Sequence, residues 1–114
     1  MEIVSLEPHL EPIFWEQVTR DIPHHFFFAL DWKHNRDKTK ILLALEQNRI
    51  EGMMLIYRQY IVQLRGSQEA VRALCEKLDL EKIELQSLKE HEQCVLEKYK
   101  PTVTHEMVLM VLRK

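Results

Sequence analysis

Short apolar runs, separated by very short polar segments, occupy the middle of the chain. The runs are Lys40–Glu46, Ile50–Tyr57 and Tyr60–Arg65, and the polar segments between them are residues 47–49 and 58–59. Apolar runs of this length with such short connections predict antiparallel strands in a β-meander.

The second run differs from the other two in its glycine and in its continuous hydrophobicity. Gly52 stands near its start, which is typical of a β-bulge or of a place where another backbone approaches closely. From Met53 to Tyr57 the run is apolar almost throughout. We therefore expect this strand to lie in the centre of the sheet with both faces covered.

Helical spacing replaces the strand pattern after the third run. Gly66 ends that run, and Ser67 is a typical helix N-cap. The apolar positions that follow mark one helical face: Val71, Leu74, Cys75 and Leu78. Residues 80–86 alternate again and predict a strand. Because a helix precedes that strand, a βαβ crossover permits parallel pairing here.

The N-terminal third predicts one strand and one or two helices. Residues 1–6 predict a short strand, and apolar positions from Ile13 to Ile22 predict a helix that Pro23 ends. The aromatic segment 24–32 predicts a short helix or an irregular segment that packs on the sheet. Residues 35–38 are polar and predict a loop.

The C-terminal quarter predicts a further helix and a last strand. Ser87 and Glu90 form a capping box, and the helix that they begin stops at Pro101. Thr104–Leu112 is β-prone and predicts a strand. The fold class is therefore α/β (α+β): a mixed, mainly antiparallel, twisted sheet of about five to six strands, with three to four helices packed on it.

Length and composition indicate a single globular domain, residues 1–114, with 46% apolar and 30% charged residues. The net charge is −2 and no block of five like charges occurs, so we expect no nucleic acid and no membrane as partner. The first residues lack the features of a signal peptide, which predicts a cytoplasmic protein. Cys75 and Cys94 then predict buried free thiols.

The order of helix, meander, helix, strand, helix and strand resembles that of a GNAT-type N-acetyltransferase. The segments that carry the resemblance are Ile50–Tyr57, Val62–Ser67 and Met107–Leu112. The chain is similar to the N-terminal half of a tandem GNAT protein. In such proteins the N-terminal half is a degenerate copy of the fold, and the C-terminal half binds acyl-CoA. The resemblance implies an accessory domain without catalysis of its own, whose partner is the C-terminal GNAT catalytic half or a second copy of itself.

The family holds the CoA pyrophosphate on backbone N–H groups of a Gln/Arg-x-x-Gly-x-Gly/Ala turn that leads into a helix. The nearest equivalent in this chain is Arg65-Gly66-Ser67. The resemblance therefore makes Arg65, Gly66 and Ser67 the candidate cofactor-binding residues, in competition with a simple strand end and a capped helix. One glycine stands where the turn has two, so we expect no cofactor in this segment, although acetyl-CoA serves the parent family.

Side chains near the aromatic segment allow two other kinds of site. Those that could ligate a metal ion are His24, His25, Asp31 and His34. Adjacent histidines diverge in a helix or strand, and no His-x-x-x-His or Cys-x-x-Cys motif accompanies them, which favours a surface or loop role. The rings of Phe26–Phe28 and Trp32 could line an acyl pocket or a partner groove, but core packing is favoured.

Two pairs near the C-terminus are weaker candidates for catalysis. Glu106 could act as a general base beside His105, but neighbouring strand residues face opposite sides of a sheet. Cys94 lies three residues from His91 on the predicted helix, a spacing that is compatible with a thiolate. Without an oxyanion device or a third partner, a core thiol is favoured.

Three functions follow from these observations. The leading hypothesis is the accessory GNAT-like domain, and the end of the chain at Lys114 predicts either a truncated protein or a stand-alone relic. The second is a self-associating module, a homodimer, in which the edge strand Met107–Leu112 pairs with its twin. The third is a minimal acetyl-CoA-dependent N-acetyltransferase with the cofactor beside Arg65–Ser67.

Overall fold

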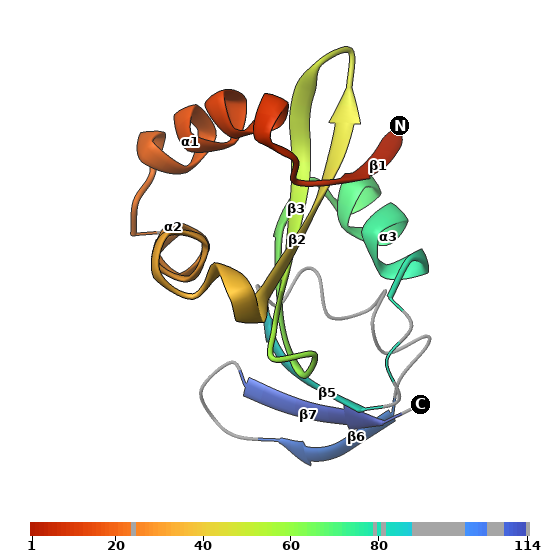
Figure 1. The fold of residues 1–114 in the computed structure, drawn as a ribbon. Helices are drawn as coiled ribbons and strands as arrows, with labels where there is room; N and C mark the ends of the chain where they lie inside the picture. Colours follow the sequence, from red (N-terminus) through yellow and green to blue (C-terminus); the bar gives the residue numbers. More distant parts are fainter. Residues whose placement is uncertain (24, 79, 81, 88–99, 105–108, 114) are drawn as a thin grey trace.

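Seven strands form one mixed sheet, with α-helices on both faces (Figure 1). The structure is a computed structural model that describes residues 1–23, 25–78, 80, 82–87, 100–104 and 109–113. The strands are β1 (Glu2–Ser5), β2 (Thr39–Glu46), β3 (Arg49–Tyr57), β4 (Ile61–Gly66), β5 (Lys82–Ser87), β6 (Lys100–Thr104) and β7 (Leu109–Arg113). The helices are α1 (Glu11–Arg20), α2 (Phe26–His34) and α3 (Gln68–Glu76), with 3₁₀ turns η1 (Pro8–Leu10) and η2 (Arg36–Lys38).

The strand order is β1-β2-β3-β4-β5-β7-β6. Neighbouring strands are antiparallel except β4 and β5, which pair in parallel across the α3 crossover. The predicted fold class, the β-meander and the crossover are therefore confirmed, and the sheet has more strands than the five to six expected. No helix in the described ranges is both long enough and apolar enough to span a bilayer.

The C-terminal part differs most from the prediction. Thr104 is the last residue of β6 and Leu109 is the first of β7, so the single strand predicted for Thr104–Leu112 contains residues of two strands. Pro101, the predicted helix stop, lies inside β6. The helix predicted after Ser87 falls on residues that the structure does not describe.

Two apolar clusters hold the helices on the sheet. On one face, α1 and α2 cover the middle strands through Phe14, Val18, Phe28 and Trp32. On the other face, α3 packs Ala70, Val71, Leu74 and Cys75 against β2, β3, β4 and β5. Met53, Met54 and Leu55 of β3 are buried, some in each cluster, which confirms the prediction of a central strand with both faces covered. The prediction that Cys75 is a buried free thiol is also confirmed.

Gly52 fulfils both roles that the sequence allowed. Ala44 pairs with Gly52 whereas Leu45 pairs with Ile50, so Glu51 is an extra residue in β3, a β-bulge. A Cβ atom on Gly52 would lie 2.7 Å from the Cβ of Ala70, because α3 crosses β3 at this point. The glycine thus lets the helix approach the sheet closely.

A carboxylate on α1 ties the two N-terminal helices together. Glu11 Oε1 accepts a hydrogen bond from Trp32 Nε1 at 3.0 Å and from Arg36 Nη2 at 2.9 Å. The Arg36 guanidinium also lies 4.5 Å from the centroid of the Trp32 ring. The Trp32 hydrogen bond, with help from Arg36, lowers the pKa of Glu11 against the opposing effect of burial.

Glu11→Gln should therefore destabilise the protein by about 1 kcal/mol at neutral pH, since the amide keeps the acceptor but loses the charge. A lowered folded pKa means that this stabilisation is present above the unfolded value and is lost as the pH falls through the folded value. Urea denaturation of both proteins should show the difference shrinking below pH 4.5. Glu16→Gln, which removes an exposed pair with Arg20, is the control and should change stability by less than about 0.5 kcal/mol. An equal effect of both substitutions would contradict the prediction.

Candidate active site

On the face of the sheet that carries the α1–α2 cluster, the side chains become polar along β4 and β5. Gln63 pairs with Leu55 and Arg65 with Met53, so both lie on the face that carries the α1–α2 cluster. On β5, Glu84 is the partner of Ile61 and is half-buried. The intervening side chains of both strands are apolar and pack on the α3 side: Val62, Leu64, Ile83 and Leu85.

Gln63 is the most unusual side chain in this strip. It is only 3% exposed, and among the described residues its Oε1 has no hydrogen-bond partner. Leaving a buried acceptor unpaired costs about 1–3 kcal/mol, so such a group in a native structure needs an explanation. It lines a cavity of about 190 Å³ with Phe27, Leu30, Asp31, Tyr57 and Ile61. A donor bound in that cavity would satisfy the Gln63 oxygen.

Asp31 brings a carboxyl group from α2 to the same cavity. It is 8% exposed, and burial raises its pKa, while a 3.2 Å hydrogen bond from Asn35 Nδ2 acts in the opposite direction. A carboxylate with a raised pKa is a stronger base than an ordinary one. The cavity therefore combines a proton acceptor with an unpaired hydrogen-bond acceptor.

Arg65 adds a positive charge two residues along β4 from Gln63. Its guanidinium lies 6.0 Å from the centroid of the buried Phe28 ring, and Nη1 donates a 2.7 Å hydrogen bond to the carbonyl of Leu64. Burial lowers the pKa of Arg65, but a guanidinium stays charged in proteins. Arg65 is thus directed to the α2 side of the sheet.

The other two predicted cofactor residues lie at the junction of β4 and α3. Gly66 pairs with Gly52, and the N–H of Ser67 donates to the carbonyl of Glu51 at 3.1 Å. Ser67 Oγ accepts the N–H of Ala70 at 3.1 Å, which confirms Ser67 as the N-cap. These contacts fit the simple strand end with a capped helix. Cofactor binding by Arg65, Gly66 and Ser67 stays a prediction.

The aromatic segment is more varied than expected. Phe28 and Trp32 belong to the core as predicted, but Phe26 and Phe27 are 49% and 46% exposed. Those two rings do not fit the core-packing interpretation, because each residue is nearly half exposed. Phe27 instead lines the cavity that holds Gln63.

His25 lies in the turn before α2, as the loop interpretation predicted, yet its ring is buried against Phe28 and contacts the carbonyl of Asp21. Within the described ranges, no three side chains of the metal-ligating kinds come together. His24, and the pairs Glu106–His105 and Cys94–His91, fall outside the residues that the structure describes.

The sequence does not single out Gln63 as a site residue, and it suggests Asp31 only as a possible metal ligand. The signal that could have found Gln63 is the alternation in Val62-Gln63-Leu64-Arg65, repeated in Ile83-Glu84-Leu85. Once the α3 crossover made β4 and β5 parallel neighbours, the polar positions of the two strands had to share a face. Asp31 has no comparable signal.

The solved structures that match nearly the whole chain include two acetyltransferases. An acetyltransferase from Streptococcus agalactiae has 14% identity and a TM-score of 0.57, with 99% of this chain and 96% of that chain covered. The chain shares its fold with this acetyltransferase. The N-acetyltransferase PseH from Campylobacter jejuni, solved in complex with acetyl coenzyme A, has 13% identity and a TM-score of 0.52, with 97% and 95% covered. No protein-family model matches the sequence, and no curated protein matches it.

The acetyltransferase fold of this chain corresponds to nearly all of each neighbour rather than to part of it. The resemblance to GNAT acetyltransferases is therefore supported at the level of the fold. The position of this domain as the N-terminal half of a tandem protein stays a prediction.

Proposed function

We propose that this chain is a minimal acetyl-CoA-dependent N-acetyltransferase, with the Gln63 cavity as its transfer site. The observation that carries the proposal is the buried, unpaired Gln63 oxygen beside the Asp31 carboxyl, on a chain with the whole acetyltransferase fold. One of the fold neighbours was solved with acetyl coenzyme A. The accessory role beside a C-terminal catalytic half, and self-association as a homodimer, stay predictions. The expectation that Met107–Leu112 forms an edge strand is wrong, because β7 lies between β5 and β6 in the sheet order.

The cavity residues suit the amine end of such a reaction. Acetyl-CoA, when bound, supplies an acetyl group activated as a thioester. Gln63 Oε1 would accept an N–H of the acceptor amine and fix its orientation, and Asp31 would take the proton that the amine loses as its nitrogen attacks the thioester carbonyl. The C–S bond of the thioester would break as the C–N bond forms, and CoA would leave as the thiol after it receives that proton. The apolar lining from Phe27, Leu30 and Ile61 lowers the polarity around the Asp31 carboxyl group, which keeps its carboxylate basic.

The β4–α3 junction is less suited to binding a diphosphate than the cavity is to binding an amine. The N–H and the Oγ of Ser67 are already engaged with Glu51 and Ala70, so Ser67 has little left to offer a phosphate. We therefore assign binding of the acceptor amine and the acetyl group to the cavity, and we assign no binding site to the diphosphate of the cofactor.

Titration calorimetry with acetyl-CoA, together with thiol release in the presence of a panel of amines, tests the proposal. The wild-type chain should bind at one site with micromolar affinity and release thiol with at least one class of amine. Gln63→Leu should lower turnover about 100-fold, because the amine loses its orienting acceptor. The same variant should keep or gain thermal stability, because a buried unpaired oxygen disappears.

Gln17→Leu, on α1 and outside the cavity, is the matched control and should leave turnover unchanged. Absence of acetyl-CoA binding at millimolar concentration would refute the proposal. Undiminished turnover by Gln63→Leu would refute the assignment of the cavity.

A further inference from the structure

A second and larger cavity, of about 560 Å³, lies on the α3 face of the sheet, away from Gln63. Its floor is apolar and consists of Leu42, Ile56 and Leu80. Leu42 and Ile56 belong to the cluster beneath α3, which places this cavity on the opposite face of the sheet from the Gln63 cavity. It has the size of an ordinary small-molecule site.

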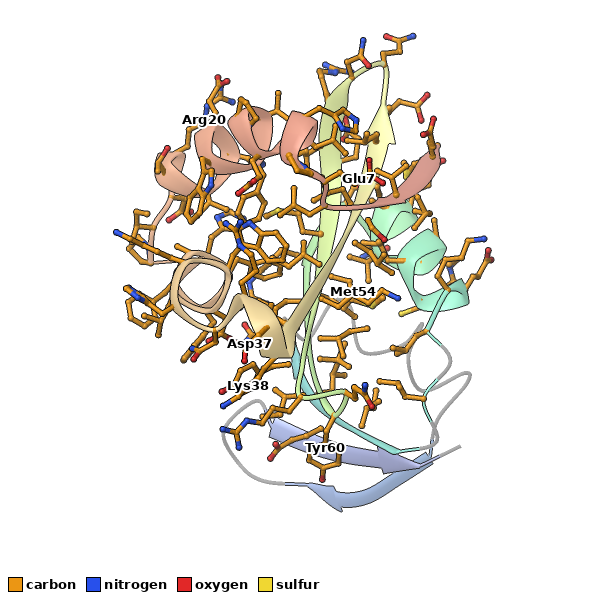
Figure 2. The ribbon with its side chains drawn as sticks, viewed as in Figure 1. Glu7, Arg20, Asp37, Lys38, Met54 and Tyr60 are labelled. Atoms are coloured by element: carbon orange, nitrogen blue, oxygen red, sulfur yellow. The ribbon has the colours of Figure 1, made fainter. Side chains whose placement is uncertain are left out.

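Four cationic side chains surround that floor, although they come from four different segments. Lys38 ends η2, Lys40 lies on β2, Arg58 is in the β3–β4 turn and Lys77 is the C-cap of α3. Figure 2 shows Lys38 and Asp37 where β2 begins and Tyr60 at the β3–β4 turn, at the same end of the sheet. The four cations thus meet through the fold and not through a run in the sequence.

The charge at this cavity contrasts with that of the whole chain. Among the described residues of the lining, four cations and one carboxylate, Asp37, give a formal charge of +3, whereas the whole chain carries −2. In the part of the chain that the structure describes, none of the four cations belongs to an ion pair. The carboxyl end of α3 offsets part of the charge of Lys77 only. Four like charges on one apolar cavity repel one another unless an anion binds among them.

We propose that this cavity binds a diphosphate group attached to an apolar or aromatic moiety. The cations surround the phosphates, and the flat part of the ligand rests on Leu42, Ile56 and Leu80. Arg58 suits this role because its guanidinium gives paired hydrogen bonds to phosphate oxygens, and Lys40 and Lys77 act as point charges. The proposal does not depend on the transfer site at Gln63.

Calorimetric titration with ADP, inorganic pyrophosphate and adenosine tests this inference. ADP should bind at one site, pyrophosphate should bind about tenfold more weakly, and adenosine should not bind measurably. Raising the salt concentration should weaken ADP binding, since the contacts are ionic. Equal affinity for ADP and pyrophosphate would overturn the role of the apolar floor, and failure of both to bind at millimolar concentration would overturn the site.

Two double variants, each of which removes two positive charges, test where ADP binds. Lys40→Gln with Lys77→Gln should weaken ADP binding tenfold or more, and both side chains are exposed, so folding should be unaffected. Arg20→Gln with Lys33→Gln removes two exposed cations outside the cavity and should leave ADP binding unchanged. Equal losses in both variants would show a non-specific charge effect and overturn the proposal. Acetyl-CoA turnover, measured alongside, reports separately on the Gln63 cavity.

Discussion

Gly66→Ala is expected to lower the free energy of unfolding by about 3 kcal/mol or more. Gly66 has φ +128°, a region that side chains rarely adopt, and its Cβ would lie 2.4 Å from both the carbonyl oxygen of Glu51 and the Cα of Gly52. Both contacts are with backbone atoms, which cannot rotate away. Urea denaturation at neutral pH measures the loss, and a variant with wild-type stability would contradict the geometry of the β4–α3 junction.

Gly52→Ala provides a matched comparison, because its new methyl group would meet a side chain. The methyl group would lie 2.7 Å from the Cβ of Ala70. Adding Ala70→Gly should therefore recover part of the stability that Gly52→Ala loses, reduced by the cost of about 1 kcal/mol for glycine in a helix. The same second substitution should not rescue Gly66→Ala. A rescue of both variants would show that the helix, and not the strand pairing, sets the clash at Gly66.

Asp31→Asn is expected to change activity and stability in opposite directions. Acetyl transfer should fall by at least about 100-fold, because the amide cannot take a proton from the amine. Stability at neutral pH should rise, because burial raises the pKa of Asp31 and so disfavours its charged form. The amide can still accept the hydrogen bond from Asn35.

The sign of the pH dependence follows from that raised pKa. The stability that the neutral carboxyl contributes is fully present below its unfolded value, near 3.8, and is lost as the pH rises through the higher folded value. Thermal melts across this pH range should therefore show that the stability of the Asp31→Asn variant, relative to that of the wild type, increases as the pH rises. Glu76→Gln, an exposed substitution on α3, should show neither effect. A less stable but fully active Asp31→Asn variant would mean that Asp31 is structural.

The meander could be predicted from the sequence because its strands carry their own signals. The apolar runs of β2, β3 and β4 are joined by turns of two or three residues, so strands that are consecutive in the sequence also pair with each other in the sheet. Pro101 misled the prediction, because proline ends helices but is also tolerated where a strand borders solvent. β6 is the last strand in the sheet order, so one of its edges needs no ladder N–H at Pro101.

The candidate site could not be predicted as a unit for a different reason. Asp31 and Gln63 lie on a helix and a strand that are far apart in the sequence, and no spacing rule links them. They meet because α2 packs on the face of the sheet that carries Gln63. Arg65 was proposed together with Gly66 and Ser67 as part of a turn, yet its side chain faces α2.

The parallel pairing of β4 and β5 also has a consequence for the order in which the molecule assembles. The meander closes only short loops, which is entropically inexpensive and fast. The pairing of β4 with β5 has to wait until α3, which lies between the two strands in the sequence, has formed and packed on the sheet. We therefore expect the pairing of β5 with β4 beside Gln63 to form late, after α2, β3 and β4, which supply the cavity residues, have come together.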